Sequence, residues 1–171
     1  YNHNIDTSKN FYPEIISTRL FENRINTLKL LGEAGVKFCS GGIIGMGETH
    51  KDRIEMILEL ANLPIPPYSV PLNTLVAIPG TLLEHQKTVP FKDFLRLIAF
   101  TRLMLPKSRI VLAAGRQYLT QSQQDKCFKA GANSIISGDK LLTTATHSFE
   151  EDGEMLQTLG YQKVSTNSVF G

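Results

Sequence analysis

The sequence predicts an α/β fold in which strand-like and helix-like segments alternate five times. Strand-like runs begin at intervals of about thirty residues, which is the size of a βα unit with a right-handed crossover. Each run is followed by a segment with apolar residues at helical spacing. An open doubly wound sheet and an arc of a βα barrel both fit this order. Five units are too few to close a barrel of eight.

The five units follow one another without a domain boundary. We expect strands over residues 1–5, 36–44, 68–78, 109–114 and 134–137. The helices are expected over about 18–34, 49–63, 90–104, 120–130 and 149–159. Their ends are marked by ordinary signals, such as Thr49 with Asp52 at a helix start, Gly35 and Gly131 at helix stops, and Pro64 beyond another helix.

Length and composition limit the class of protein. A chain of 171 residues that is 42% hydrophobic can bury one sizeable core. The net charge is +2 and the basic residues are scattered, which argues against nucleic acid or a membrane surface as the main partner. Two cysteines without C-x-x-C spacing favour a reducing compartment. The chain starts inside a strand-like segment without Met, so we expect it to be part of a longer protein.

The stretch Cys39 to Glu48 carries a thiol, four glycines and a carboxylate between a strand and a helix. Glycines let the backbone approach another surface closely or turn with positive φ. Such a strand, turn and helix start can present backbone N–H groups to a flat or anionic ligand. Without further information, the simplest interpretation of Cys39 is a small buried apolar residue, although it shares its strand face with Gly41, Ile43 and Gly45. We assign Cys127 to the core.

Polar side chains also interrupt the predicted strands. Asn2, Asn4 and Asp6 alternate onto one face of the first strand, where a barrel lumen would need a polar ligand to pair them. Turn chemistry explains residues 6–8 equally well. Asn73 stands in an otherwise apolar strand, so its amide must pair with backbone or with a ligand. Two further candidates follow the fifth strand, where a cap or loop role is the simpler explanation: Thr143 and Thr144.

Seven segments in order carry a resemblance to a known family. They are 1–8 (YNHNIDTS), 17–19 (STR), 39–43 (CSGGI), 70–73 (VPLN), 114–116 (AGR), 130–135 (AGANSI) and 140–144 (KLLTT). On these segments the chain resembles the biotin synthase family of radical S-adenosylmethionine (SAM) enzymes. The run Gly41-x-Ile43-x-Gly45-x-x-Glu48 also matches the adenine-side motif of radical SAM enzymes in general.

The resemblance implies an incomplete (βα)8 TIM-type barrel, of which this chain is about units four to eight. Residues 1–171 would form the C-terminal part of a radical SAM barrel domain, with barrel units over 1–146 and the final helix and tail over 147–171. The last helix and tail match the family weakly.

The implied reaction inserts sulfur into dethiobiotin to form biotin. A [4Fe-4S] cluster, whose ligands lie outside this segment, would reduce SAM to methionine and a deoxyadenosyl radical that takes hydrogen from dethiobiotin. Sulfur from a second, [2Fe-2S] cluster would close the ring. The family also implies a homodimer, a reducing electron-transfer protein as partner, and a cytoplasmic location, or the mitochondrial matrix in a eukaryote.

Residue by residue, the resemblance assigns Cys39 as one ligand of the [2Fe-2S] cluster. The residues implied at SAM are Asn4, Asp6, Arg24, Gly41, Ile43, Gly45, Glu48 and Val76. Amides suit the donors and acceptors of a ureido ring, and the residues implied at the substrate are Asn2, Asn4 and Asn73 at the ureido ring and Thr143 and Thr144 at the carboxylate.

Two departures from the family limit the assignment. The C-x3-C-x2-C motif for the SAM-cleaving cluster is absent from these residues, so we expect the segment alone to be inactive. Val111 stands where the family often has an arginine ligand, and Arg109 lies two residues earlier on the same face. The fourth ligand of the second cluster is therefore open. Two alternatives remain, another radical SAM barrel enzyme with a different substrate and a non-catalytic truncated barrel that binds a ligand or partner.

Overall fold

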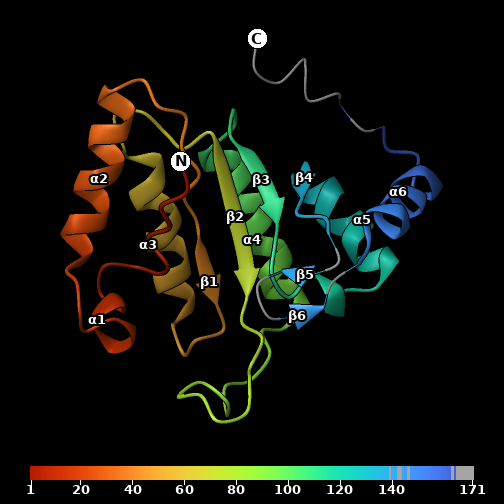
Figure 1. Ribbon diagram of the computed structural model, residues 1–171, viewed down its shortest axis with the longest axis horizontal. Coiled ribbons are helices and arrows are strands. Elements are labelled where there is room, and N and C mark those ends of the chain that lie inside the picture. The colour runs from red at the N-terminus through yellow and green to blue at the C-terminus, as the bar shows by residue number, and fades with distance from the viewer. Residues whose placement is uncertain (139, 142–143, 146, 163, 165–171) are drawn as a thin grey trace.

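The computed structural model describes residues 1–138, 140, 141, 144, 145, 147–162 and 164. Its centre is a parallel sheet of four strands in the order β1-β2-β3-β4. The strands are β1 (Gly42–Ile44), β2 (Ser69–Thr74), β3 (Arg109–Leu112) and β4 (Ser134–Ile135). In Figure 1 the sheet crosses the middle of the molecule, with α2 on one side and α5 and α6 on the other.

The helices follow the strands as predicted, with two additions. They are α1 (Tyr12–Ile15), α2 (Phe21–Glu33), α3 (His50–Ala61), α4 (Phe91–Met104), the 3₁₀ turn η1 (Arg116–Tyr118), α5 (Gln121–Ala130) and α6 (Phe149–Thr158). The sequence did not predict α1 or η1, and it did not predict the antiparallel pair β5 (Lys140–Leu141) and β6 (Thr144–Ala145). No helix within the described residues is long and apolar enough to cross a membrane.

The first predicted strand is present as an extended segment beside β1. Its backbone N–H groups at His3 and Ile5 donate to the carbonyls of Cys39 and Gly41, at 2.9 and 3.1 Å. Parallel bridges join Asn2 to Cys39 and Asp6 to Gly42. These residues therefore add a fifth chain segment to the sheet at the β1 edge.

Several predicted boundaries are wrong because the expected elements are shorter. The sheet keeps only Gly42–Ile44 of the expected strand 36–44, although a bridge from Cys39 to Ser69 extends the pairing by one isolated point. The expected strand 68–78 ends at Thr74, where residues 75–90 leave the sheet. The expected strand 134–137 is likewise only two residues long. The helix expected from about residue 18 begins at Phe21, and its N-cap residue makes no side-chain hydrogen bond.

The two faces of the sheet differ in what they pack against. Val70, Leu72, Ile110 and Leu112 are at most 1% exposed and belong to the core between sheet and helices. Side chains alternate along a strand, so the intervening residues point to the opposite, inner face. Val111 lies on that inner face and outside the core cluster. By strand register, the predicted site residues Cys39, Ile43 and Asn73 lie on this inner face.

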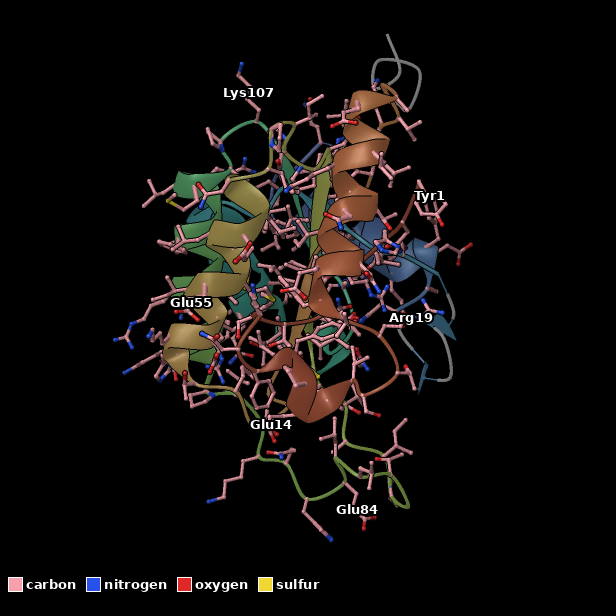
Figure 2. All side chains as sticks on the ribbon, turned by 90° about the vertical axis from the view of Figure 1, so that its left-hand side faces the viewer. Tyr1, Glu14, Arg19, Glu55, Glu84 and Lys107 are labelled. Atoms are coloured by element: carbon pink, nitrogen blue, oxygen red, sulfur yellow. The ribbon has the colours of Figure 1, made fainter. Side chains whose placement is uncertain are left out.

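The carboxyl ends of the strands define one end of the molecule. Glu84, in the connection after β2, lies at that end together with Glu14, and Lys107, just before β3, lies at the other (Figure 2). Parallel α/β proteins bind ligands at the carboxyl ends of their strands. The glycine-rich turn after β1 is at this end.

Candidate functional site

The glycine-rich turn after β1 is closed by its own glutamate. The carboxylate of Glu48 accepts hydrogen bonds from the backbone N–H groups of Gly45 and Met46, each at 2.7 Å. Gly45 and Gly47 have φ of +96° and +115°, which favours glycine. The expectation of exposed backbone N–H groups for an anionic ligand is therefore wrong at Gly45 and Met46, because an internal carboxylate already fills that position.

The long connection between β2 and α4 packs over the same turn. A Cβ placed on Gly45 would lie 3.0 Å from Val89, and one on Gly47 would lie 3.2 Å from the amide of Gln86. Next to this contact is an apolar cleft of about 420 Å³, and its lining includes Leu75, Val76, Ile78, Leu82, Leu83 and Ile15. Val76, one of the predicted SAM residues, therefore lies in a cleft beside the glycine turn.

Two of the predicted SAM residues, Asp6 and Arg24, are in contact. The guanidinium Nη2 of Arg24 lies 3.3 Å from Oδ2 of Asp6, and its Nε donates to the hydroxyl of Tyr12 at 3.3 Å. Burial raises the pKa of the Asp6 carboxyl, while the charge of Arg24 opposes that rise. Asp6 also has φ of +68°, where Asp and Asn are the usual non-glycine residues. The pair therefore places a charged group at the end of the first strand segment.

Two of the three predicted asparagines pair through their side chains with the backbone of the sheet. Asn4 accepts a hydrogen bond from the N–H of Gly41 at 3.1 Å. Asn73 donates to the carbonyl of Gly42 at 3.0 Å and accepts from the N–H of Ala114 at 3.1 Å. The sequence left the backbone and a ligand as possible partners of the Asn73 amide, and the structure shows the backbone. Each amide has further hydrogen-bonding capacity beyond these contacts.

Cys39 lies on the inner face at the start of the sheet and is half-buried. Register pairs it with Asn2 on one side and Ser69 on the other, and Ser69 pairs with Arg109. Arg109 therefore occupies the same cross-strand row as Cys39, while Val111 lies two residues further along β3. The guanidinium of Arg109 lies 5.1 Å from the centre of the Tyr68 ring.

Cys127 has the core position that the sequence predicts. It is fully buried in α5, and burial raises the pKa of its thiol to about 12. Among the residues that the structure describes, no group of three or more His, Cys, Asp or Glu side chains could hold a metal ion. The role of Cys39 as a cluster ligand stays a prediction.

The remaining predicted residues belong to the last unit. Thr143 lies outside the described residues. Thr144 belongs to β6 and pairs with Leu141 of β5. Asn2, predicted at the substrate with Asn4 and Asn73, is exposed at the sheet edge.

Sequence reasoning missed a buried ion pair that joins the last helix to the sheet. Arg116 donates to both carboxylate oxygens of Asp152 at 2.7 and 2.8 Å, to Gln124 at 3.0 Å and to the carbonyl of Ile136 at 3.2 Å. The side chains of Arg116 and Asp152 are 1% and 3% exposed. The AGR segment marked the position of Arg116, but its partner is 36 residues away and nothing local identifies it.

Comparison with solved structures supports the architecture. The crystal structure of methylornithine synthase matches 98% of this chain and 53% of its own, with a TM-score of 0.79 at 19% identity. HydG from Carboxydothermus hydrogenoformans, an FeFe-hydrogenase maturase, matches with a TM-score of 0.75 at 18% identity over 94% of this chain and 42% of its own. The chain therefore has the fold of a partial βα barrel, as predicted.

Sequence comparison identifies the family. Residues 71–162, just over half the chain, match the Biotin and Thiamin Synthesis associated domain. Biotin synthases of Brucella anthropi and Neorickettsia sennetsu are each 52% identical over 160 residues, which is 94% of this chain and 48% and 49% of those proteins. That of Buchnera aphidicola is 50% identical over 160 residues, covering 94% of this chain and 46% of its own length.

The fold is that of part of a βα-barrel protein. The chain belongs to the Biotin and Thiamin Synthesis associated domain family. It spans about half the length of the curated relatives that it matches.

Proposed function

We propose that this chain is the C-terminal part of an enzyme that inserts sulfur into dethiobiotin to form biotin by radical SAM chemistry. One observation carries the proposal most directly. Cys39 lies on the inner face of the sheet, next to the edge that holds Asn4 and the Asp6–Arg24 pair. The identity of about 50% to biotin synthases extends over 94% of the chain, which supports the same proposal.

The residues at the carboxyl end of the sheet fit the adenosyl and methionine parts of SAM. Asp6 and Arg24 supply an acceptor and a cation in contact with each other. The glycine turn, Ile43 and Val76 supply close-packed backbone and an apolar wall. Glu48 is committed to the N–H groups of the turn, so its role is to shape the turn instead of touching the ligand.

The substrate would meet the asparagines and the last unit. Asn2, Asn4 and Asn73 present amides at the β1 and β2 side, where a urea group needs donors and acceptors together. Thr143 and Thr144 are the proposed partners of the substrate carboxylate. The apolar inner face around Val111 would exclude water from the reacting carbon.

The donor set also fits one position of an iron–sulfur cluster. Cys39 is accessible on the inner face, as a thiolate ligand requires, whereas Cys127 is not. We propose Cys39 as a ligand of the [2Fe-2S] cluster, with the other cysteine ligands and those of the [4Fe-4S] cluster outside this chain. When bound, the clusters and SAM would supply the electron, the hydrogen-abstracting group and the sulfur. A reducing compartment, a reducing electron-transfer protein and a homodimer belong to the same proposal.

The decisive experiment uses the complete protein that contains this chain, reconstituted anaerobically with iron and sulfide. Iron per chain and Mössbauer spectra are compared for the parent, Cys39→Ala and the control Cys127→Ala. Selective loss of the [2Fe-2S] signal in Cys39→Ala, with the [4Fe-4S] signal kept, is expected. If both cluster signals persist in Cys39→Ala, Cys39 is a packing residue and its assignment as a cluster ligand is refuted.

A second candidate rests on Val111 at a position where the family often has arginine. It is a radical SAM barrel enzyme with another substrate. Biotin formation from dethiobiotin by the complete protein separates the two, because only the first candidate produces it.

A further inference from the structure

Arg53 lies directly behind the glycine turn and makes its charged contact there. It belongs to the first turn of α3, where its backbone N–H donates to Thr49. Its Nε donates to Oε1 of Glu48 at 2.6 Å. The Arg53 side chain is 12% exposed and that of Glu48 is 1% exposed. A strongly charged hydrogen bond is therefore almost completely shielded from water.

The buried Glu48 carboxylate accepts hydrogen bonds from two backbone N–H groups and from one cation, Arg53. Its Oε1 accepts from Gly45 and Arg53, and its Oε2 accepts from Met46. A buried carboxylate that loses its cation keeps its desolvation cost and is drawn toward water. Such a movement would take its oxygens away from the two N–H groups of the turn. Arg53 therefore stabilises the backbone conformation of the glycine turn through its contact with Glu48.

The conformation of the turn determines which backbone groups point away from Glu48 and where the connection beside the cleft lies. A trans peptide places its carbonyl opposite its N–H, so the N–H of Met46 pointing to Glu48 directs the carbonyl of Gly45 away from it. Val89 and Gln86 pack on Gly45 and Gly47, so a shift of the turn also displaces the connection that contains Val76. The wall of the cleft that residues 75–83 form therefore depends on the turn.

We propose that Arg53 is a positioning residue for the ligand that binds at the glycine turn. It acts through Glu48 and does not itself touch the ligand. The proposal rests on the proposed function in one respect, because that function makes the ligand the adenosyl group of SAM.

The first test measures the turn itself by hydrogen exchange and mass spectrometry on the complete protein. Arg53→Gln should speed the exchange of the Gly45 and Met46 amides at least tenfold, while the Leu72 amide in β2 is unchanged. The matched control is Arg96→Gln, which removes an arginine of α4 that is 78% exposed. General destabilisation would speed exchange in the turn and in β2 together. Unchanged exchange in the turn would overturn the proposal.

The second test measures SAM binding by isothermal titration. We expect Kd to rise at least tenfold in Arg53→Gln and by less than twofold in Arg96→Gln. Arg53→Lys keeps a single charged donor and should restore part of the affinity, and it also serves if Arg53→Gln does not fold. An unchanged Kd with altered exchange would refute positioning of the ligand. If the parent protein does not bind SAM, the proposed function fails, and the exchange result still decides whether Arg53 holds the turn.

Discussion

Two buried arginine–carboxylate pairs at the carboxyl end of the sheet differ in what they join. Glu48 and Arg53 are five residues apart, and their carboxylate also binds two N–H groups of its own turn. Arg116 and Asp152 are 36 residues apart, and their arginine also binds Gln124 and the carbonyl of Ile136. The first pair fixes the conformation of a loop. The second joins β3, β4, α5 and α6.

The difference shows how similar charged contacts can have separate consequences. Loss of the local pair leaves the rest of the core intact, so its effect should concentrate in the turn and in whatever binds there. Loss of the distant pair releases a helix and leaves a charge buried without a partner. Stability measurements should therefore distinguish the two pairs.

The largest effect is expected for Arg116→Met. Removing one partner of a buried ion pair typically costs about 3 to 5 kcal/mol, because the remaining charge keeps its desolvation penalty. Urea unfolding should show a loss of free energy of this size. Arg96→Met is the control, since the Arg96 side chain is 78% exposed and the loss of its contact with Asp93 should cost less than about 1 kcal/mol.

A double variant tests the cause of that loss. Arg116→Met combined with Asp152→Leu removes both charges, and replacement of a buried pair by apolar residues is often nearly neutral. The double variant should therefore be more stable than Arg116→Met alone. If it is less stable, the unpaired charge of Asp152 is not the cause of the loss in Arg116→Met.

Gly115→Ala should have the next largest effect, at the same end of the sheet. Gly115 has φ of +85°, and a Cβ there would run into the side chain of Thr74. Strain and crowding together should cost about 3 kcal/mol. Gly35→Ala separates the two causes, because Gly35 has φ of +69° with nothing within 4 Å of a Cβ, and should cost about 1 kcal/mol. Equal costs at the two glycines would exclude crowding as a cause.

The sequence predicted the βα order because that order rests on local signals. The capping boxes at Thr49 and Thr120 and the glycine at the end of α5 are all within a few residues of the helices they bound. Strand lengths were predicted less well, because a strand ends where its partner ends. β2 stops where Asn73 and Thr74 bond to Ala114, which only the folded sheet brings near.

The candidate site shows the same division. The sequence identified the glycines and Glu48 because their spacing is local. It did not predict the direction of the N–H groups of Gly45 and Met46, because that direction depends on the Glu48 side chain folding back onto the turn. The ion pair of Arg116 and Asp152 was not predicted, because the two residues meet only in the tertiary structure. That Cys39 and Arg109 share a row follows from strand register, which the sequence did not specify.

The two cysteines extend the contrast to reactivity. Cys39 is half-buried on the inner face, whereas burial holds the pKa of Cys127 at about 12. At pH 8 a thiol with that pKa is about one part in ten thousand thiolate. Titration of the native chain with Ellman's reagent should therefore label one thiol quickly and the second only in urea. Fast labelling that persists in Cys39→Ser would contradict this assignment.

The smallest effect concerns Asp6, whose contact with Arg24 compensates its charge less completely than Arg116 compensates Asp152. The pKa of Asp6 is raised by burial, so the folded state holds its proton more tightly than the unfolded state does. Stability contributed by the protonated form is therefore present below the unfolded pKa and is lost as pH rises through the folded pKa. Asp6→Asn removes this loss and keeps a residue that tolerates positive φ. Relative to the parent, Asp6→Asn should become more stable between pH 3 and pH 7, as measured by urea unfolding at each pH. The opposite trend would show that the ion pair with Arg24 outweighs burial of the carboxylate.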